Sequence, residues 1–410
     1  MGVRDYWFSL KSHVYVEFKK DKILLYNTQN GNCLETELKE AIGLISELYE
    51  PKNLGVALLT KEMQSHPDIW RFVENVLEKQ MGDLMDMEKM PNKPIRLIPI
   101  LNLQKDIDRL KKNEEDSVLI GKDTMYYLLE LTIYLNDICT ERCSYCNSYC
   151  RQTLCCTAQN TKSELSVEEL ENLFRQIQYS SVGKVNILGG NIFQYRDITK
   201  IQPLLDSFKE IIHCYFHYDN YETNVLSGSL ALELTVNFPL KKDAFKNTWQ
   251  LIDREKTTLH FIIENEEQYI EVENLIDEFN PAKYNIHPFF SGRNWDFFRE
   301  NIFLDKEDIF SKTLSIREIF RNQKLNSNFF GSLFILPDGT VKASMNTQAL
   351  GNIRTDSILS LIYREMLDNT AWRTVRNTQP CNECIYQYIC PAPSNYEFVT
   401  GKPNLCHIKP

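Results

Sequence analysis

Residues 135–146 read LNDICTERCSYC and place three cysteines, Cys139, Cys143 and Cys146, within eight positions. The apolar and β-branched run at 131–135 comes directly before this loop and predicts a strand. Thiolates are soft ligands that suit iron–sulfur clusters, and a C-x3-C-x2-C loop can hold three corners of a cubane. The fourth iron would then lack a protein ligand and could bind a small molecule. The motif therefore predicts a reactive cluster.

Three further cysteines, Cys150, Cys155 and Cys156, follow this loop. A zinc knot needs four ligands in closed tetrahedral geometry, and any one of the three could supply the fourth. A structural zinc site therefore stays open as the alternative to the cluster, and the sequence assigns no role to the extra cysteines.

From residue 126 onward the pattern alternates between strand and helix. Ser166 with Glu169 three residues later forms a capping box at the start of a helix over 166–178, and a second helix is predicted over 201–212. Repeated βα units predict an α/β fold with a parallel sheet, here a partial (β/α)6 barrel whose site lies at the carboxyl ends of the strands. The predicted strands cover 131–135, 184–188, 214–218, 233–237, 259–263 and 284–288.

The first ninety residues have a different pattern. Short apolar runs at 14–18 and 23–27 flank a polar turn, a third strand passes through Leu34, and helical periodicity follows over 38–48 and 69–77. Met90-Pro91-Asn92-Lys93-Pro94 marks a boundary because two nearby prolines stop a helix. We therefore predict a domain of three strands plus helices over 1–90, a linker or bridging segment over 91–125, the barrel over 126–325 and a cysteine-rich extension over 326–410.

The second cysteine group defines that extension. Cys381, Cys384, Cys390 and Cys406 have the spacing C-x2-C-x5-C-x15-C, a strong metal-binding signal. By chemistry alone, a four-thiolate zinc site and a 4Fe–4S cluster fit the four residues equally well.

Bulk properties narrow the class of protein. With 410 residues, a formal net charge of −10 and a pI of about 5.4, the chain repels phosphate backbones, so nucleic acid is not an expected partner. The N-terminus lacks a secretion signal and the sequence lacks an apolar run of membrane-spanning length, so we expect a cytoplasmic protein without a membrane partner. In that reducing compartment the 12 cysteines stay available for metals.

The first motif, with Tyr145 just before the last cysteine, resembles the signature of the radical S-adenosylmethionine (SAM) superfamily. The resemblance implies a 4Fe–4S cluster on Cys139, Cys143 and Cys146 that binds SAM, with Tyr145 against the cofactor. Cleavage of SAM would then give a 5′-deoxyadenosyl radical, and this radical would abstract hydrogen from the substrate. The family usually has Gly-Gly-Glu after its second barrel strand, and here Gly189-Gly190-Asn191 stands there. The resemblance makes these three residues cofactor-binding, although an amide accepts a weaker hydrogen bond from the SAM ammonium than a carboxylate does.

Residues 326–410 resemble the SPASM extension of radical SAM peptide maturases, which normally holds two auxiliary clusters. Ser344 and Ser394 stand where two ligands of one cluster are expected, whereas Cys381, Cys384, Cys390 and Cys406 match the complete set of the other. The resemblance therefore implies one auxiliary 4Fe–4S cluster. His287, at the end of a predicted strand, is interpreted as a packed histidine.

The N-terminal domain is similar in plan to leader-peptide-recognition modules, which add a peptide strand to a sheet edge. Taken together, the chain resembles radical SAM/SPASM peptide maturases, closest to the Bacteroidales double-glycine peptide-maturation group. The implied function is an enzyme that modifies a ribosomally made precursor peptide by hydrogen abstraction. Because Asn191 replaces the usual Glu, the alternative is a pseudo-radical-SAM companion that binds the precursor peptide or a partner maturase without catalysis.

Overall fold

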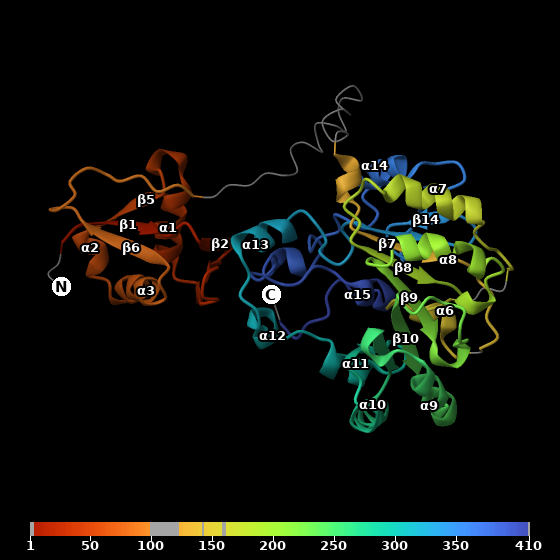
Figure 1. Cartoon of the computed structure of the whole chain (residues 1–410). Helices are drawn as coiled ribbons and strands as arrows, with labels where there is room; N and C mark the ends of the chain where they lie inside the picture. The colour runs from red at the N-terminus through yellow and green to blue at the C-terminus, as the bar shows by residue number, and fades with distance from the viewer. Residues whose placement is uncertain (1–3, 99–122, 142, 158–160, 409–410) are drawn as a thin grey trace.

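The computed structural model describes residues 4–98, 123–141, 143–157 and 161–408. Figure 1 shows the N-terminal helices at one end of the molecule, the large sheet at the other, and α12 and α13 between them. The N-terminal helices are α1 (Lys39–Tyr49), α2 (Lys61–Gln64) and α3 (Pro67–Glu78). The later helices are α6 (Cys146–Tyr149), α7 (Val167–Ile177), α8 (Ile198–Ser207), α9 (Lys242–Leu251), α10 (Glu266–Phe279), α11 (Trp295–Asn301), α12 (Lys306–Phe310), α13 (Ile316–Asn322), α14 (Ile358–Asp368) and α15 (Asn395–Thr400).

The large sheet has nine strands in the order β12-β11-β10-β9-β8-β7-β13-β14-β15. Strands β7 to β12 pair in parallel in chain order, which confirms the predicted α/β fold class with six βα-type units. The six are β7 (Glu130–Tyr134), β8 (Lys184–Leu188), β9 (Ile212–His217), β10 (Ala231–Asn237), β11 (Thr257–Ile263) and β12 (Lys283–Pro288).

The sheet continues beyond the six predicted strands. Strand β13 (Ser332–Ile335) pairs in parallel with β7, and the antiparallel strands β14 (Thr340–Lys342) and β15 (Ala349–Asn352) follow it. The same sheet therefore crosses residue 326, where the sequence predicts a domain boundary.

The helices between the strands differ from expectation in two places. Helix α7 begins after Ser166 with the predicted capping box, but α8 ends at Ser207 and not at residue 212. The reason is that Ile212 begins β9 and pairs with Val185 of β8. Within the described residues, β9 and β10 are joined by a single turn of 3-10 helix, Tyr218–Asn220, and not by an α-helix.

The N-terminal domain contains two small sheets. The predicted hairpin and third strand are β2 (Val14–Lys19), β3 (Lys22–Asn27) and β4 (Cys33–Thr36), in that spatial order. A second sheet, β5-β1-β6, comprises β1 (Tyr6–Leu10), β5 (Val56–Leu59) and β6 (Gly82–Asp86). Sequence reasoning missed these three strands because each is short and pairs with a segment far away in the chain.

The sheet β2-β3-β4 is shared between two cores. Ile23 and Leu25 face the N-terminal helices, whereas Leu24 and Tyr26 face α12, α13 and the C-terminal segment, and all four side chains are fully buried. Tyr26 Oη accepts a hydrogen bond from the backbone N–H of Leu314 at 2.9 Å. This sheet therefore joins the N-terminal domain to the cysteine-rich extension.

Residues 99–122 of the predicted linker lie outside the described residues. Before them the chain returns to the N-terminal domain, where Arg96 N donates to Leu54 O at 2.9 Å and Arg96 forms an ion pair with Asp83 at 2.7 Å. In the described part of the chain, every helix is too short or too polar to cross a membrane.

Candidate metal centre

The first cysteine loop starts where β7 ends and is fastened to the end of β8. Leu135 N donates to Leu188 O at 2.7 Å, and the buried Asn136 side chain donates to Asn191 O at 2.8 Å. In return Asn191 N donates to Ile138 O at 2.7 Å. Ile138, the residue before Cys139, is therefore hydrogen-bonded to the segment that follows β8, the strand next to β7.

Gly189 and Gly190 are needed for this close approach. A Cβ at Gly189 would lie 2.5 Å from Asn136 Oδ1, and one at Gly190 would lie 2.3 Å from Ile138 O. Any side chain would push the cysteine loop off the strand. The glycine pair thus has a structural role in seating the loop.

Asn191 is buried in the same contact between the cysteine loop and the end of β8. It is 4% exposed, and its Oδ1 accepts a hydrogen bond from Phe193 N at 3.0 Å. That oxygen is the atom by which Asn191 would receive an ammonium group, and in this structure it caps the following 3-10 turn instead.

Amides from the next two strands point at two thiols of the motif. Asn220 Nδ2 donates to Cys139 Sγ at 3.7 Å, and the Asn237 side chain hydrogen-bonds to Cys143. Asp219 N donates to His217 Nδ1 at 3.2 Å, so His217 Nε2 carries the proton and donates to Asn237 Oδ1 at 2.6 Å. This leaves the Asn237 amide N–H groups for the sulfur.

Sequence reasoning missed Asn220 and Asn237. The available signal was their position, because one follows β9 and the other ends β10, at the same edge of the sheet as the cysteine loop. Donors to ligating sulfurs tune metal affinity and redox potential, so both residues belong to the site.

The thiols of the motif are half-buried, and the neutral form is favoured at Cys139 and Cys143. Burial raises the pKa of Cys143 to about 11, and the nearby Cys156 adds to the rise. Burial likewise raises the pKa of Cys139. A bound cation would favour the thiolate forms, which are the metal-binding forms.

The extra cysteines gather at the same place. Cys155 Sγ and Cys156 Sγ are 3.9 Å apart, and both side chains are buried. Cys156 interacts electrostatically with Cys139 and Cys143, and Cys155 with Cys143 and Cys146. A fourth thiol is therefore close to the three-cysteine motif.

Tyr145 lies in an aromatic cluster at the ends of β11 and β12. Its ring centroid is 5.0 Å from that of Phe289 and 6.1 Å from that of Tyr149. Gln152 fastens the same loop to β12 by exchanging two hydrogen bonds with the backbone of Phe290, at 2.7 and 3.0 Å.

The four cysteines of the second group line one cavity beside α12. Cys381 begins a 3-10 turn, and Cys384 follows it directly. Cys390 closes a turn with Tyr386, and Cys406 forms an isolated β-bridge with Leu304. The sequence-predicted set is thus brought together, although its members span 26 residues.

A buried arginine, which sequence reasoning also missed, contacts this group. Arg376 is 7% exposed; its guanidinium donates to Cys381 Sγ at 3.9 Å and to Glu397 at 2.8 Å. A buried cation needs anions around it, and Glu397 with metal-bound thiolates would meet that need. The arrangement fits a negatively charged sulfur centre.

Ser344 and Ser394 also lie near each other, on either side of Asn395. Ser394 caps α15 and donates to Glu397 at 2.6 Å, whereas Ser344 Oγ donates to Asn395 Oδ1 at 3.4 Å. Both hydroxyls are used in local hydrogen bonds.

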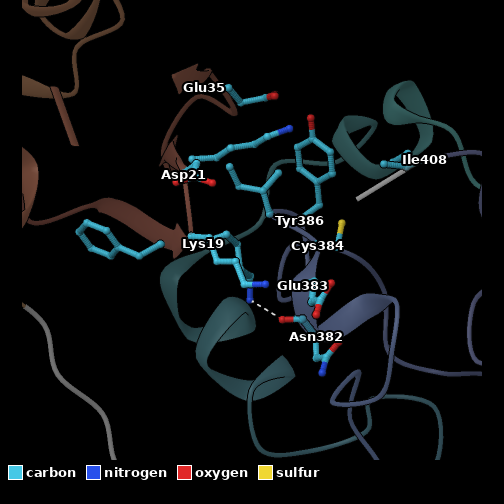
Figure 2. A pocket seen from close by; sticks show the side chains of 12 residues that line it. Lys19, Asp21, Glu35, Asn382, Glu383, Cys384, Tyr386 and Ile408 are labelled. Atoms are coloured by element: carbon cyan, nitrogen blue, oxygen red, sulfur yellow. Dashed lines mark hydrogen bonds between the residues drawn. The ribbon is translucent and has the colours of Figure 1, made fainter. Parts of the chain in front are cut away.

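A pocket opens between the β2–β3 hairpin and the second cysteine group (Figure 2). Lys19 Nζ crosses it to donate to Asn382 O at 3.0 Å and to Gln387 Oε1 at 2.7 Å. Cys384 lines both this pocket and the four-cysteine cavity, so the pocket leads from the surface to that cavity.

Among the described residues, neither cysteine group forms a compact site for a single metal ion. Across the described ranges, no three His, Cys, Asp or Glu side chains are arranged to hold a single metal ion. Tetrahedral zinc, with its sulfurs about 2.3 Å away, would need such a compact set.

The chain matches no known protein family and no curated protein by sequence. Among solved structures it is similar to Streptococcus suis SuiB, with a TM-score of 0.49 at 14% identity over 98% of this chain and all of that one. SuiB bound to its precursor peptide SuiA gives 0.47 at 15% identity over 98% and 99% of the chains. A protein described as anSMEcpe with bound AdoMet gives 0.41 at 11% identity over 64% and 88%. The precursor peptide is a ligand of SuiB, and AdoMet is a ligand of anSMEcpe.

Proposed function

We propose that this chain is a radical SAM protein that acts on a ribosomally made peptide. The observation that carries the proposal is the convergence of four strand ends on the first cysteine loop. The loop leaves β7, and Gly189 and Gly190 at the end of β8 hold it. Asn220 after β9 donates to Cys139, and Asn237 at the end of β10 lowers the pKa of the Cys143 thiol against the effect of burial.

The donor set fits an iron–sulfur cluster at both sites. The first loop offers Cys139, Cys143 and Cys146, and a set of three leaves one iron for SAM. Three thiolates in one loop are soft ligands of the kind that iron–sulfur clusters use. When bound, the cluster and SAM together supply one-electron reduction and hydrogen abstraction from a peptide.

The second group would hold an auxiliary cluster with all four corners filled. Cys381, Cys384, Cys390 and Cys406 supply the ligands, and Arg376 compensates the negative charge. Such a centre can pass electrons but has no open iron for a substrate. The pocket at Cys384 would give a redox partner access to it.

The precursor peptide would bind along the free edge of β2, which pairs only with β3 among the described residues. Lys20 and Asp21 form a two-residue turn, so Lys19 and Lys22 are a hydrogen-bonded pair. Alternation then directs the backbone N–H and C=O groups of Val16 and Phe18 to the open edge. That edge borders a groove flanked by Tyr49 and Ile98 on one side and by Ile316, Phe320 and Gln323 on the other.

The groove suits an extended apolar segment. Unpaired backbone groups along an edge offer main-chain hydrogen bonds, and pockets beside them select side chains. Phe18 and Tyr49, whose ring centroids are 5.3 Å apart, are each 38% exposed there.

A non-catalytic companion role has one observation in its favour. Asn191 Oδ1 accepts from Phe193 N and so is occupied within the fold. A protein that binds the peptide or a partner maturase would need the edge of β2 but not a competent SAM site.

Anaerobic reconstitution with iron and sulfide, then dithionite and SAM, tests the catalytic proposal through 5′-deoxyadenosine formation. We expect product from the wild type and none from Cys143→Ala, which should also lose about half of the cluster iron because only one of two 4Fe–4S sites is affected. Cys33→Ala removes a thiol outside both groups and should change neither quantity. Iron-loaded protein without product would support the companion role, and recovery of product in Asn191→Glu would then identify the missing group.

Peptide binding is tested separately with precursor peptides that carry double-glycine leaders. Val16→Pro removes one edge N–H without breaking a bond to β3, whereas Val16→Ala keeps that N–H. We expect the proline variant to bind at least about tenfold more weakly and the alanine variant to bind nearly normally, because main-chain bonds carry affinity in strand addition. Equal binding by both variants would exclude this edge.

A further inference from the structure

A chain of hydrogen bonds, buried at its centre and part-buried elsewhere, runs across the parallel strands from β9 to the cysteine loop. His213 Nδ1 lies 2.7 Å from Glu233 Oε1, and Glu233 Oε2 lies 2.7 Å from His260 Nε2. His260 Nδ1 lies 2.9 Å from His287 Nε2, and His287 Nδ1 lies 3.3 Å from Thr153 Oγ1. Each of the four histidine and carboxylate residues comes from a different neighbouring strand, β9 to β12.

The protons in this chain can be placed by elimination. Although burial opposes it, hydrogen bonds from His213 and His260 lower the pKa of Glu233 to about 2, so its carboxylate is ionised and can only accept. His213 Nδ1 and His260 Nε2 must therefore donate. His260 Nδ1 then accepts from His287 Nε2–H, and His287 Nδ1 accepts from the Thr153 hydroxyl.

The middle of the chain is buried, and both of its ends are more accessible. The side chains of Glu233 and His260 are 7% and 9% exposed. His213 at one end is 28% exposed, and Thr153 and His287 at the other end are half-buried at the carboxyl ends of the strands. Two residues after His287, the Phe289 ring packs on Tyr145 of the cysteine loop. The Thr153 end of the chain thus adjoins the predicted cofactor site.

We propose that Thr153, His287, His260 and Glu233 form a proton-accepting relay for the substrate in the barrel site. Thr153 Oγ1 takes a proton from an X–H group of the substrate as its own proton passes to His287 Nδ1. The proton on His287 Nε2 passes to His260 Nδ1. The products are the deprotonated substrate and a His260 imidazolium, which forms an ion pair with the Glu233 carboxylate.

This inference rests on the proposed function in one respect: oxidative bond formation in a peptide releases a proton as well as an electron. The electron would leave through the auxiliary cluster, and the relay supplies the place for the proton. The other ionisable side chain facing the relay on β9 is Tyr215, 5.3 Å from His260 between ring centroids. Cys214 is buried on the opposite face of that strand, where Glu233 adds to the rise in its pKa that burial causes. Lys184 and Glu130 lie nearby and face each other at 3.9 Å.

Histidine NMR on the full chain as purified, labelled with ¹⁵N in the imidazoles, tests the relay without cofactor or peptide. We expect His260 and His287 both protonated at Nε2 at pH 8. On acidification His287 should take up a second proton only near pH 4, since burial, then His260, lowers its pKa to about 4.

The matched variants are Glu233→Gln and Glu130→Gln, both of them carboxylates of the barrel interior. Glu233→Gln replaces one acceptor oxygen with an amide NH2 group, so His213 and His260 can no longer both donate to this side chain, and the tautomer pattern of the histidines should change. Glu130→Gln should leave the pattern unchanged. Protonation of His260 or His287 at Nδ1 in the wild type at pH 8, or an unchanged pattern in Glu233→Gln, would overturn the relay whatever the fate of the proposed function.

With active enzyme and peptide, the ratio of modified peptide to 5′-deoxyadenosine is the second readout. Loss of a proton acceptor should lower that ratio about 10²-fold in Glu233→Gln at pH 7, and the loss should shrink as pH rises. An unchanged ratio across the pH range would also overturn the relay, since a purely structural carboxylate would change stability and not this ratio.

Discussion

The two cysteine groups differ in the number of their motif thiols and in the side chains that surround them. The second group matches four thiols to four corners, surrounds them with apolar side chains and places a buried arginine beside them. The first group offers three motif thiols with neutral amide donors, and holds extra thiols nearby. A closed, charge-compensated set stabilises a fold, whereas an incomplete set with adjustable surroundings leaves room for a reacting molecule. Under the proposed function, the first group would bind the reacting molecule, and the second would hold a closed cluster that passes electrons.

The largest effect is expected at the charge compensation of the second group. Arg376→Gln leaves Glu397 buried without its cation, which should lower the free energy of unfolding by about 3–5 kcal/mol. Denaturant titration measures it. The double variant Arg376→Gln/Glu397→Gln should recover most of the loss, and a fully additive double variant would mean that the two charges do not compensate each other.

A pH test separates the surroundings of the first group from those of the second. Burial holds the pKa of His287 near 4, below its ordinary value of about 6.5, so between these values the unfolded chain binds more protons than the folded one. Stability from neutral His287 is complete above pH 6.5 and should fall by about 3 kcal/mol as pH drops to 4. Unfolding curves of wild type and His287→Gln across that range give the difference, and parallel pH profiles for the two proteins would contradict the assignment.

The amide donors of the first group give a smaller effect. Asn237→Ala removes the hydrogen bond to Cys143 and should weaken iron binding at the first site by about 10–100-fold, as loss of such outer groups usually does. Competition with a chelator measures the affinity. Thr235→Val, two residues earlier on the same strand and face, should not alter it, and an equal loss in both variants would point to a general disturbance of β10.

The smallest effect is expected where the resemblance anticipates a ligand that the chain lacks. Ser394→Ala removes the cap of α15 and should cost about 1 kcal/mol of stability. Its iron content should equal that of wild type, because Ser394 serves the helix and not a cluster. Iron loss in this variant would show that the serine contributes to a metal site after all.

Much of the fold could be predicted from local pattern. Strands 131–135 and 184–188 lie within one residue of β7 and β8, and the capping box at Ser166 starts α7 as expected. Strands β1, β5 and β6 could not be predicted, because non-local pairing and not sequence alternation stabilises them. The parallel pairing of β13 with β7 could not be predicted either, because it depends on tertiary packing.

The residues of the candidate sites also fall into those that the sequence predicted and those that it could not predict. Cysteine spacing identified both groups, because ligands from one loop leave a contiguous trace in the sequence. Asn220, Asn237 and Arg376 act from separate segments and carry no such trace. The interpretation of His287 as a packed histidine described its burial but not its partners, since the four-residue chain comes from three other segments.

The sheet β2-β3-β4, with one face in each of two cores, also limits how this protein can be divided or recombined. A chain cut after residue 90 would uncover the apolar sides of α12 and α13 that Leu24 and Tyr26 now shield. The N-terminal domain therefore cannot be exchanged between proteins as an independent cassette. Substitutions in the groove beside β2 would therefore have to keep the face of β3 that covers α12 and α13.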